Sequence, residues 1–173
     1  MNKEIIMLGS GGHATSLLEI LRSHNKSISA VFSQNKNESS INFPNSDHFY
    51  NDEDICKFNP EKVLIVNGIG AVPQNETRNK VYQKFKSSRF HFLTLISNSS
   101  QLAEDVHLGE GVQILNGVII NSGSTIDYQT IVNTGVIIEH GCKIGSNCHL
   151  APGVIVCGDV RIQDNVFIGP GAI

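Results

Sequence analysis

Residues 131–156 read IVNTGVIIEHGCKIGSNCHLAPGVIV, and an aliphatic side chain occupies every sixth position. The same spacing continues without an insertion from Leu102 to the end of the sequence. Neither an α-helix, with 3.6 residues per turn, nor a plain strand, with a repeat of two, produces it. A hexapeptide repeat is typical of a parallel β-helix. The aliphatic positions are Leu102, Leu108, Ile114, Ile120, Ile126, Val132, Ile138, Ile144, Leu150, Val156, Ile162 and Ile168.

The repeat also predicts the dimensions of the β-helix. Three hexads form one three-sided coil of 18 residues, and coils stack at about 4.8 Å, so four coils give a prism of about 19 Å. A second series, which begins at Val106 and also steps by six, is always small or medium in size. Such an interior leaves no room for large rings, in agreement with 6% aromatic residues and no Trp. We expect the corners at Gly109, Gly117, Gly123, Gly135, Gly141, Gly145 and Gly153.

The first part of the chain follows a different pattern, in which short apolar runs alternate with helical spacings. This alternation predicts an α/β, Rossmann-like domain over residues 1–96, followed by the β-helix over 97–173. Residues 34–54 are rich in Asn, Ser and Asp, which favours a loop or a mobile segment. The expected strands are 4–8, 28–32, 63–66 and 91–96, and the expected helices cover 17–21 and 77–85.

Composition excludes several classes of function. The 173 residues carry 13 Lys and Arg against 16 Asp and Glu, a net charge of -3 that argues against a general nucleic-acid binder. No apolar run reaches the length of a membrane span, and the N-terminus lacks the pattern of a secretory signal, so we expect a cytoplasmic protein. The spacing of the four cysteines does not indicate a disulfide scaffold.

A zinc site is the superficial interpretation of Cys142 and Cys148 beside His140 and His149. The hexad phase directs the two cysteines inward on different sides of the prism, so four ligands do not converge. We therefore predict no metal site.

A glycine-rich turn follows the first predicted strand. Gly9, Gly11 and Ala14 fit the pattern G-x-G-x-x-A, which brings a phosphate close to the backbone at a helix N-terminus. The acidic residue that an NAD-binding domain would show about 20 residues later is replaced by Ser33 and Gln34. The alternative interpretation is a tight strand-to-helix turn without a ligand.

These features together resemble the sialic-acid O-acetyltransferases and the N-acetyltransferases of bacillosamine-type amino-sugar nucleotides. The segments that carry the resemblance are Gly9–His13, Asn67–Gly70 with Arg78, and Asn133–Gly145. The resemblance implies a left-handed β-helix, acetyl-CoA as co-substrate and a nucleotide-sugar or sialic-acid-like substrate. It also implies that Gly11, Gly12, His13 and Gly70 hold the phosphate or carboxylate of that substrate.

Two departures from the family concern the active site. The residue after the family's catalytic histidine is usually acidic, whereas this chain has Gly141. The sequence ends at Ile173 on a hexad boundary, where relatives continue into further coils and a tail that completes the acetyl-CoA site. We expect that the chain is either cut short or capped by another element, because a bare final coil exposes strand edges and core.

Acetyl transfer needs a base near neutral pH, and His140 is the candidate. Gly158 follows it by one coil, which leaves space above the ring and offers a backbone N–H to the thioester oxygen. Glu139 is a second candidate for the catalytic site, as a residue that orients His140. The alternative is that His140 is simply a solvent-exposed corner residue.

His149 and Asn133 match family residues that contact acetyl-CoA. His149 lies half a coil from His140, more than about 10 Å away within one chain, so a shared site requires neighbouring subunits of a homotrimer. The alternative to coenzyme binding is that His149 is a surface residue and that Asn133 serves only to form a turn. Lys143 and Arg161 lie one coil apart and could supply positive charge for coenzyme A. The alternative interpretation is that they are solvent-exposed residues of a corner without a ligand.

The sequence thus predicts an acetyl-CoA-dependent sugar acetyltransferase with direct transfer and His140 as general base. The acceptor is either the amine of an amino-sugar nucleotide or a hydroxyl of a sialic-acid-like sugar. A non-catalytic trimeric β-helix protein that binds a nucleotide sugar is the alternative.

Overall fold

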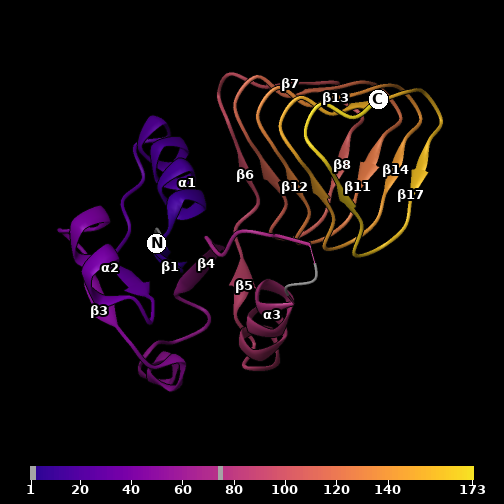
Figure 1. Ribbon diagram of the computed structural model, residues 1–173. Coiled ribbons are helices and arrows are strands. Elements are labelled where there is room, and N and C mark those ends of the chain that lie inside the picture. The colour runs from indigo at the N-terminus through magenta and orange to yellow at the C-terminus, as the bar shows by residue number, and fades with distance from the viewer. Residues whose placement is uncertain (1–2, 74–75) are drawn as a thin grey trace. The chain divides into compact units, whose positions relative to one another are not determined.

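The computed structural model describes residues 3–73 and 76–173, apart from the side chain of Glu38. Contacts within the chain divide it into two units, Met1–Leu93 and Thr94–Ile173. The first is an α/β unit and the second is a stack of short strands (Figure 1). Each unit is described by itself.

The α/β unit contains a five-stranded parallel sheet in the order β3-β2-β1-β4-β5. Its central strand β1 is the almost entirely buried apolar run that the sequence predicted, and helix α1 turns five apolar side chains into the core. This order is that of a doubly wound fold with its switch point beside β1. The strands are β1 (Glu4–Leu8), β2 (Ala30–Phe32), β3 (Asp47–Phe49), β4 (Val63–Asn67) and β5 (His91–Phe92), and the long helices are α1 (Gly12–Ser23) and α3 (Thr77–Ser87).

The prediction of irregular structure over residues 34–54 is wrong. This segment forms helix α2 (Lys36–Asn42), strand β3 and the start of the 3-10 helix η1 (Asp52–Lys57). The polar composition was misleading, because Asn51 caps η1 by accepting a hydrogen bond from the Glu53 backbone. Strand β3 is held by register with β2 and by the stacking of Phe49 on Phe32, at 4.9 Å between ring centroids. Tertiary pairing thus outweighed local propensity.

The single strand expected over residues 91–96 is instead two strands in two different sheets. Strand β5 completes the α/β sheet, whereas β6 (Leu95–Ile96) pairs with a strand 18 residues later. Ile96 lies six residues before Leu102 and packs against the β-helix core. The β-helix therefore starts one hexad earlier than the predicted series, and its unit starts at Thr94 rather than at residue 97.

The predicted parallel β-helix is confirmed. Every strand has two residues, every pairing is parallel, and each register offset is 18, as in Ile119 with Ile137. The three sheets, which form the sides of the prism, have the orders β16-β13-β10-β7, β17-β14-β11-β8 and β18-β15-β12-β9-β6. The strands after β6 are β7 (Gln101–Leu102), β8 (His107–Leu108), β9 (Gln113–Ile114), β10 (Ile119–Ile120), β11 (Thr125–Ile126), β12 (Ile131–Val132), β13 (Ile137–Ile138), β14 (Lys143–Ile144), β15 (His149–Leu150), β16 (Ile155–Val156), β17 (Arg161–Ile162) and β18 (Phe167–Ile168).

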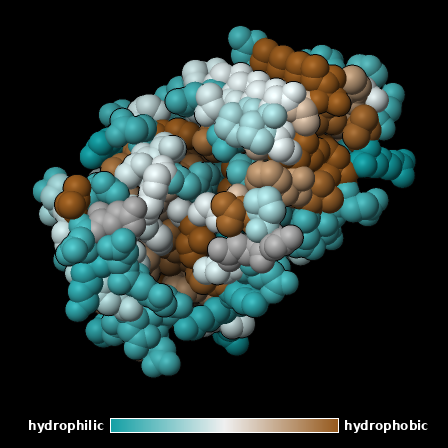
Figure 2. Space-filling view, in the orientation of Figure 1, coloured by the Kyte–Doolittle hydropathy of each residue, from teal (hydrophilic) through white to brown (hydrophobic). Residues whose placement is uncertain are grey.

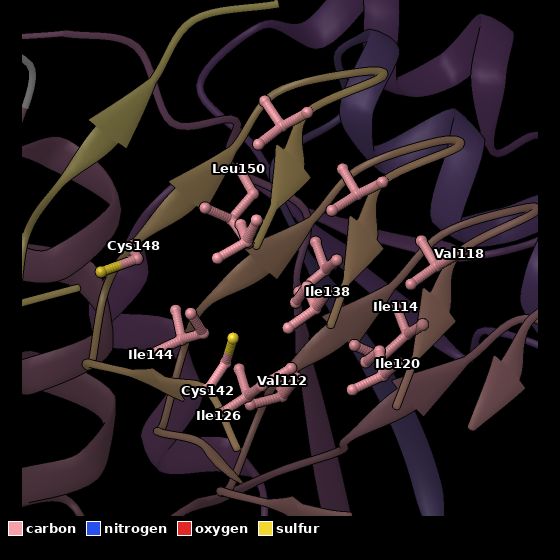
Figure 3. Close-up of a cluster of buried hydrophobic side chains, with 14 residues drawn as sticks. Val112, Ile114, Val118, Ile120, Ile126, Ile138, Cys142, Ile144, Cys148 and Leu150 are labelled. Carbon is pink, nitrogen blue, oxygen red and sulfur yellow. The ribbon is translucent and has the colours of Figure 1, made fainter. Parts of the chain in front are cut away.

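The interior is filled by the two series that the hexads predicted. The second residue of each strand points inward, and the small residue two positions before it, directly ahead of the strand, packs beside it, as Figure 3 shows for Ile138 and Cys142 among others. Many of these side chains are completely inaccessible, including Val112, Ile114 and Ile138. Two-residue strands cannot be stable alone, so the stacked apolar core holds the coils together.

The corners adopt a left-handed backbone conformation at every sixth residue from Gly111 to Gly171. Glycine supplies seven of these positions, since it lacks the Cβ that makes positive φ unfavourable. Gln129, Asn147, Asp159 and Asn165 supply the other four. Gly109 and Gly145, which were expected among the turn glycines, lack positive φ and serve a different purpose. A Cβ on either would overlap the backbone of the next coil, at 2.6 Å from the Tyr128 nitrogen and 2.7 Å from the Asp164 nitrogen.

We expect the replacement Ile144→Ala to destabilise the β-helix by about 2–5 kcal/mol, because Ile144 is 1% exposed and its removal leaves a cavity. Lys143→Ala, at the outward position of the same strand, is the matched control and should change the unfolding free energy by less than about 0.5 kcal/mol. Urea denaturation followed by circular dichroism measures both values. Equal effects of the two replacements would contradict the inward assignment of Ile144.

Candidate active site

His140 lies at the corner that connects β13 to β14, and its ring lies against the glycine one coil later. A Cβ built on Gly158 would be 2.7 Å from Nε2 and 2.8 Å from Cε1 of His140. The ring therefore fills the space that any other residue at 158 would occupy. The side chain of His140 is 66% exposed, so a substrate can reach its nitrogens.

The backbone N–H of Gly158 has no hydrogen-bond partner within residues 3–73 and 76–173. The neighbouring amide of Asp159, in contrast, donates to the carbonyl of His140 at 2.8 Å. An unpaired amide next to an accessible imidazole is the arrangement that an oxyanion donor requires.

Glu139 lies next to His140 in the sequence, but its carboxylate is bound elsewhere. Oε2 of Glu139 accepts a hydrogen bond from Asn121 Nδ2 at 2.9 Å, on the same corner one coil earlier. The acidic group within ion-pair distance of the imidazole is Asp159, whose Oδ2 is 3.9 Å from Nδ1. The sequence did not select Asp159, because a spacing of 18 residues from Gly141 places it on the same corner but does not give the direction of its side chain.

Asn133 and His149 are brought together, as expected for two groups of one binding site. Nδ2 of Asn133 and Nε2 of His149 are 3.1 Å apart, and the His149 ring contacts Phe167 edge-on at 5.1 Å between centroids. Asn133 follows β12 and His149 is the outward residue of β15, which belong to a different sheet from the strand before His140. One chain thus carries two separate groups of predicted site residues.

The glycine-rich turn of the α/β unit has the geometry of an anion-binding turn. Gly9 has φ +83°, Gly11 is the N-cap of α1, and Gly12 and His13 begin its first turn. Gly70 follows β4 and lies against this turn, since a Cβ on it would be 3.6 Å from that of His13. The four predicted substrate-binding residues therefore lie at one edge of the sheet.

Arg78 and Gly68 build the neighbouring turn, and neither was selected as a site residue. Nη1 of Arg78 donates to the carbonyls of Asn67 and Ile69, at 2.7 Å each, and burial lowers the pKa of Arg78 to about 9. A Cβ on Gly68 would overlap Met7 and Ala14, so this glycine allows β4 and α1 to pack closely. Arg78 and Gly68 thus determine the shape of the turn that follows β4.

The buried cysteines of the β-helix are core residues. The thiols of Cys142 and Cys148 donate to the carbonyls of Cys157 and Gln163, at 3.1 and 3.0 Å. Burial raises the pKa of both thiols, so neither forms a thiolate nucleophile near neutral pH. Within the described part of the chain, no three His, Cys, Asp or Glu residues gather as metal ligands, and all four cysteines are free.

Lys143 and Arg161 are paired in register on the outer face of β14 and β17, as their spacing predicted. They line a shallow pocket that also includes Thr125, Asp127 and Asp164. The two acids offset much of the local positive charge, which weakens the case for a phosphate at this place.

Among the described residues, no helix has both the length and the apolar character needed to cross a bilayer.

Two family models match the chain, one in each unit. The PglD N-terminal domain matches residues 4–85, and the bacterial transferase hexapeptide (six repeats) matches residues 141–173. The fold and these repeats define an acyltransferase of the hexapeptide-repeat class. The chain is thus similar to the hexapeptide-repeat acetyltransferases that carry a PglD-type N-terminal domain.

Solved structures have the same architecture over nearly the whole chain. PerB from Caulobacter crescentus, in complex with CoA and GDP-perosamine, is 26% identical with a TM-score of 0.74, over 97% of this chain and 86% of that one. A histidine-to-asparagine variant of perosamine N-acetyltransferase from the same organism is 23% identical, with a TM-score of 0.79 and the same coverage. The acetyltransferase domain of PglB from Neisseria gonorrhoeae, with acetyl coenzyme A, is 17% identical with a TM-score of 0.74, over 100% and 91%. The predicted left-handed β-helix is thereby confirmed.

Proposed function

We propose that this chain transfers an acetyl group from acetyl-CoA to the amine of an amino sugar carried on a nucleotide. The observation that carries the proposal is the accessible His140 imidazole lying against Gly158, whose N–H has no partner among the residues that the structure describes. The likeness to PerB, which binds CoA and GDP-perosamine, supports the choice of both substrates.

Direct transfer is the mechanism that these residues support. His140 removes a proton from the amine while the nitrogen attacks the thioester carbonyl carbon. The Gly158 N–H donates to the oxygen that becomes negative, the carbon–sulfur bond breaks, and CoA leaves as the thiolate. The buried cysteines favour a mechanism without an acyl-enzyme, because they are neither ionised nor accessible.

The N-terminal turn is proposed to hold the phosphates of the nucleotide sugar. Gly11, Gly12 and His13 offer backbone amides at the start of α1, where the helix dipole attracts an anion. Gly70, opposite His13, leaves space for the ligand to approach. An amino-sugar nucleotide brings two phosphates to such a turn, whereas a free sialic acid brings one carboxylate.

Release of CoA distinguishes the acceptors. Purified protein, acetyl-CoA and a thiol reagent are combined with a panel of amino-sugar nucleotides and, separately, with sialic acids. We expect CoA release only with the amino-sugar nucleotides. Release with sialic acids alone would replace N-acetylation by O-acetylation, and binding of nucleotide sugars without release would refute the transferase proposal.

We further propose that the protein is a homotrimer whose active sites lie between subunits. Ile119, Ile137 and Ile155 form a row on the outer face of the sheet β16-β13-β10-β7, and all three are only half-buried. Figure 2 shows brown, hydrophobic atoms in a band across the β-helix. An apolar row of this kind favours contact with another copy. Such a contact would bring Asn133 and His149 of one subunit toward His140 of the next.

Mixing two inactive variants tests this arrangement. We expect His140→Ala and His149→Ala chains to be weakly active alone and to recover activity when they are refolded together. In random mixing, roughly one quarter of the sites combine an intact His140 with an intact neighbouring His149. Failure of the mixture to exceed either variant, in particles of trimer mass, would contradict a site shared between subunits.

The cytoplasmic location expected from the sequence is part of this proposal. Four free cysteines, two of them exposed, fit a reducing compartment.

A further inference from the structure

We propose that Asp159 is the positioning residue of His140, holding the imidazole so that Nδ1 carries the proton and Nε2 accepts one from the substrate. This inference rests on the proposed function, in which His140 is the general base. A base of this kind is usually oriented by a third group that binds its other nitrogen.

The corner brings Asp159 to His140 through the 18-residue coil. Asp159 lies one coil after Gly141, and its Oδ2 is 3.9 Å from Nδ1 of His140. This separation is that of an ion pair, longer than a hydrogen bond, and such contacts commonly tighten when substrate binds. The Asp159 N–H also donates to the His140 carbonyl at 2.8 Å, so the backbone fixes the acid beside the histidine.

Gly141 creates the space for this carboxylate. A Cβ on Gly141 would overlap Oδ1 of Asp159, so the acid occupies the volume that a side chain next to His140 would need. The carboxylate of Asp159, which belongs to the following coil, therefore fills the space beside His140 that the absent side chain of residue 141 leaves open. Glu139, the acid adjacent to His140 in the sequence, accepts its hydrogen bond from Asn121.

The backbone conformation of Asp159 suits its proposed role. Its φ is +59°, a conformation that Asp and Asn adopt more readily than most residues. Both side chains are largely exposed, at 66% for His140 and 80% for Asp159, so their attraction adds little to folding stability. Replacing Asp159 should therefore affect catalysis far more than stability.

The test compares Asp159→Asn and Asp159→Gly with the wild type. We expect kcat to fall about 10- to 100-fold, because a misplaced base loses catalytic efficiency steeply, with KM within about twofold and an unchanged melting temperature. Asn165→Gly removes a side chain from the equivalent turn position of a corner that lacks a histidine, and it should leave kcat unchanged.

The second experiment moves the carboxylate from position 159 to position 141. In the double variant Asp159→Gly with Gly141→Asp, a carboxylate returns to the corner from the neighbouring position, and we expect kcat to recover most of the loss. Wild-type kcat in both single variants overturns the inference while leaving the proposed function intact. A loss of kcat with a lowered melting temperature and no recovery in the double variant also overturns it, since the role would then be structural.

The third arm does not depend on turnover. Long-range ¹H–¹⁵N spectra of the histidine rings, with His140 assigned by His140→Gln, report which nitrogen is protonated in the neutral ring. We expect the Nδ1–H form in the wild type and the Nε2–H form in Asp159→Asn. The same form in both proteins overturns the inference, even if no acceptor for the transferase is found.

Discussion

Replacement of His140 by alanine is expected to lower kcat by about 10²- to 10⁴-fold, the usual contribution of a positioned general base. KM for acetyl-CoA should change little, because the predicted coenzyme contacts are Asn133 and His149. Stability should also be unchanged, since the His140 side chain is 66% exposed and lies outside the hydrophobic core. Steady-state CoA release and thermal unfolding measure the two properties.

The control for this experiment is His107→Ala. His107 is an exposed outward residue of the same β-helix, in register two coils before Lys143, and its Nδ1 lies 2.9 Å from the Asp105 carbonyl. We expect wild-type kcat in this variant. If His140→Ala and His107→Ala had the same activity, His140 would be a surface residue and the proposed mechanism would lose its base.

The second large effect is expected from Gly158→Ala. The added methyl group would be 2.7 Å from Nε2 of His140, so the ring must leave its position. Since the atoms that it meets belong to an exposed side chain and Gly158 lacks positive φ, the protein can fold around the change. We expect kcat to fall about 10- to 100-fold at a nearly unchanged melting temperature.

Gly169→Ala is the matched control, because a Cβ on Gly169 meets no atom within 4 Å and this glycine also lacks positive φ. Both variants are compared by CoA release and by thermal unfolding. A Gly158→Ala protein with wild-type kcat would mean that the ring position seen here is not the catalytic one. A large loss of stability would instead assign Gly158 a role in packing.

The sequence predicted the β-helix well because its core is periodic. When one hexad is placed, the spacing of six and the coil of 18 determine which side chains point inward, as with Ile138 and Ile144. They also determine that Gly158 lies one coil above His140. The same rule would have identified Ile96 as the first member of the series.

The α/β unit was predicted less completely, because its pairings are not periodic. Residues 34–54 contain few apolar side chains, and β3 exists because Phe49 packs on Phe32 and its backbone pairs with β2. Likewise, nothing local indicates that Arg78 is buried and binds the carbonyls of Asn67 and Ile69. Such contacts depend on which strands become neighbours.

The sequence alone determined the architecture of the C-terminal unit and its hydrophobic interior, since a strict repeat turns position along the chain into position in space. The choice of His140 as the proposed base came from the family resemblance. Only the tertiary structure decided which acid approaches that histidine. Glu139 is adjacent in the chain but binds Asn121, whereas Asp159 comes from the next coil and lies 3.9 Å from Nδ1. The physical reason is that a side chain's direction at a corner depends on the backbone angles of that turn and on the space left by Gly141, and neither follows from the spacing of six.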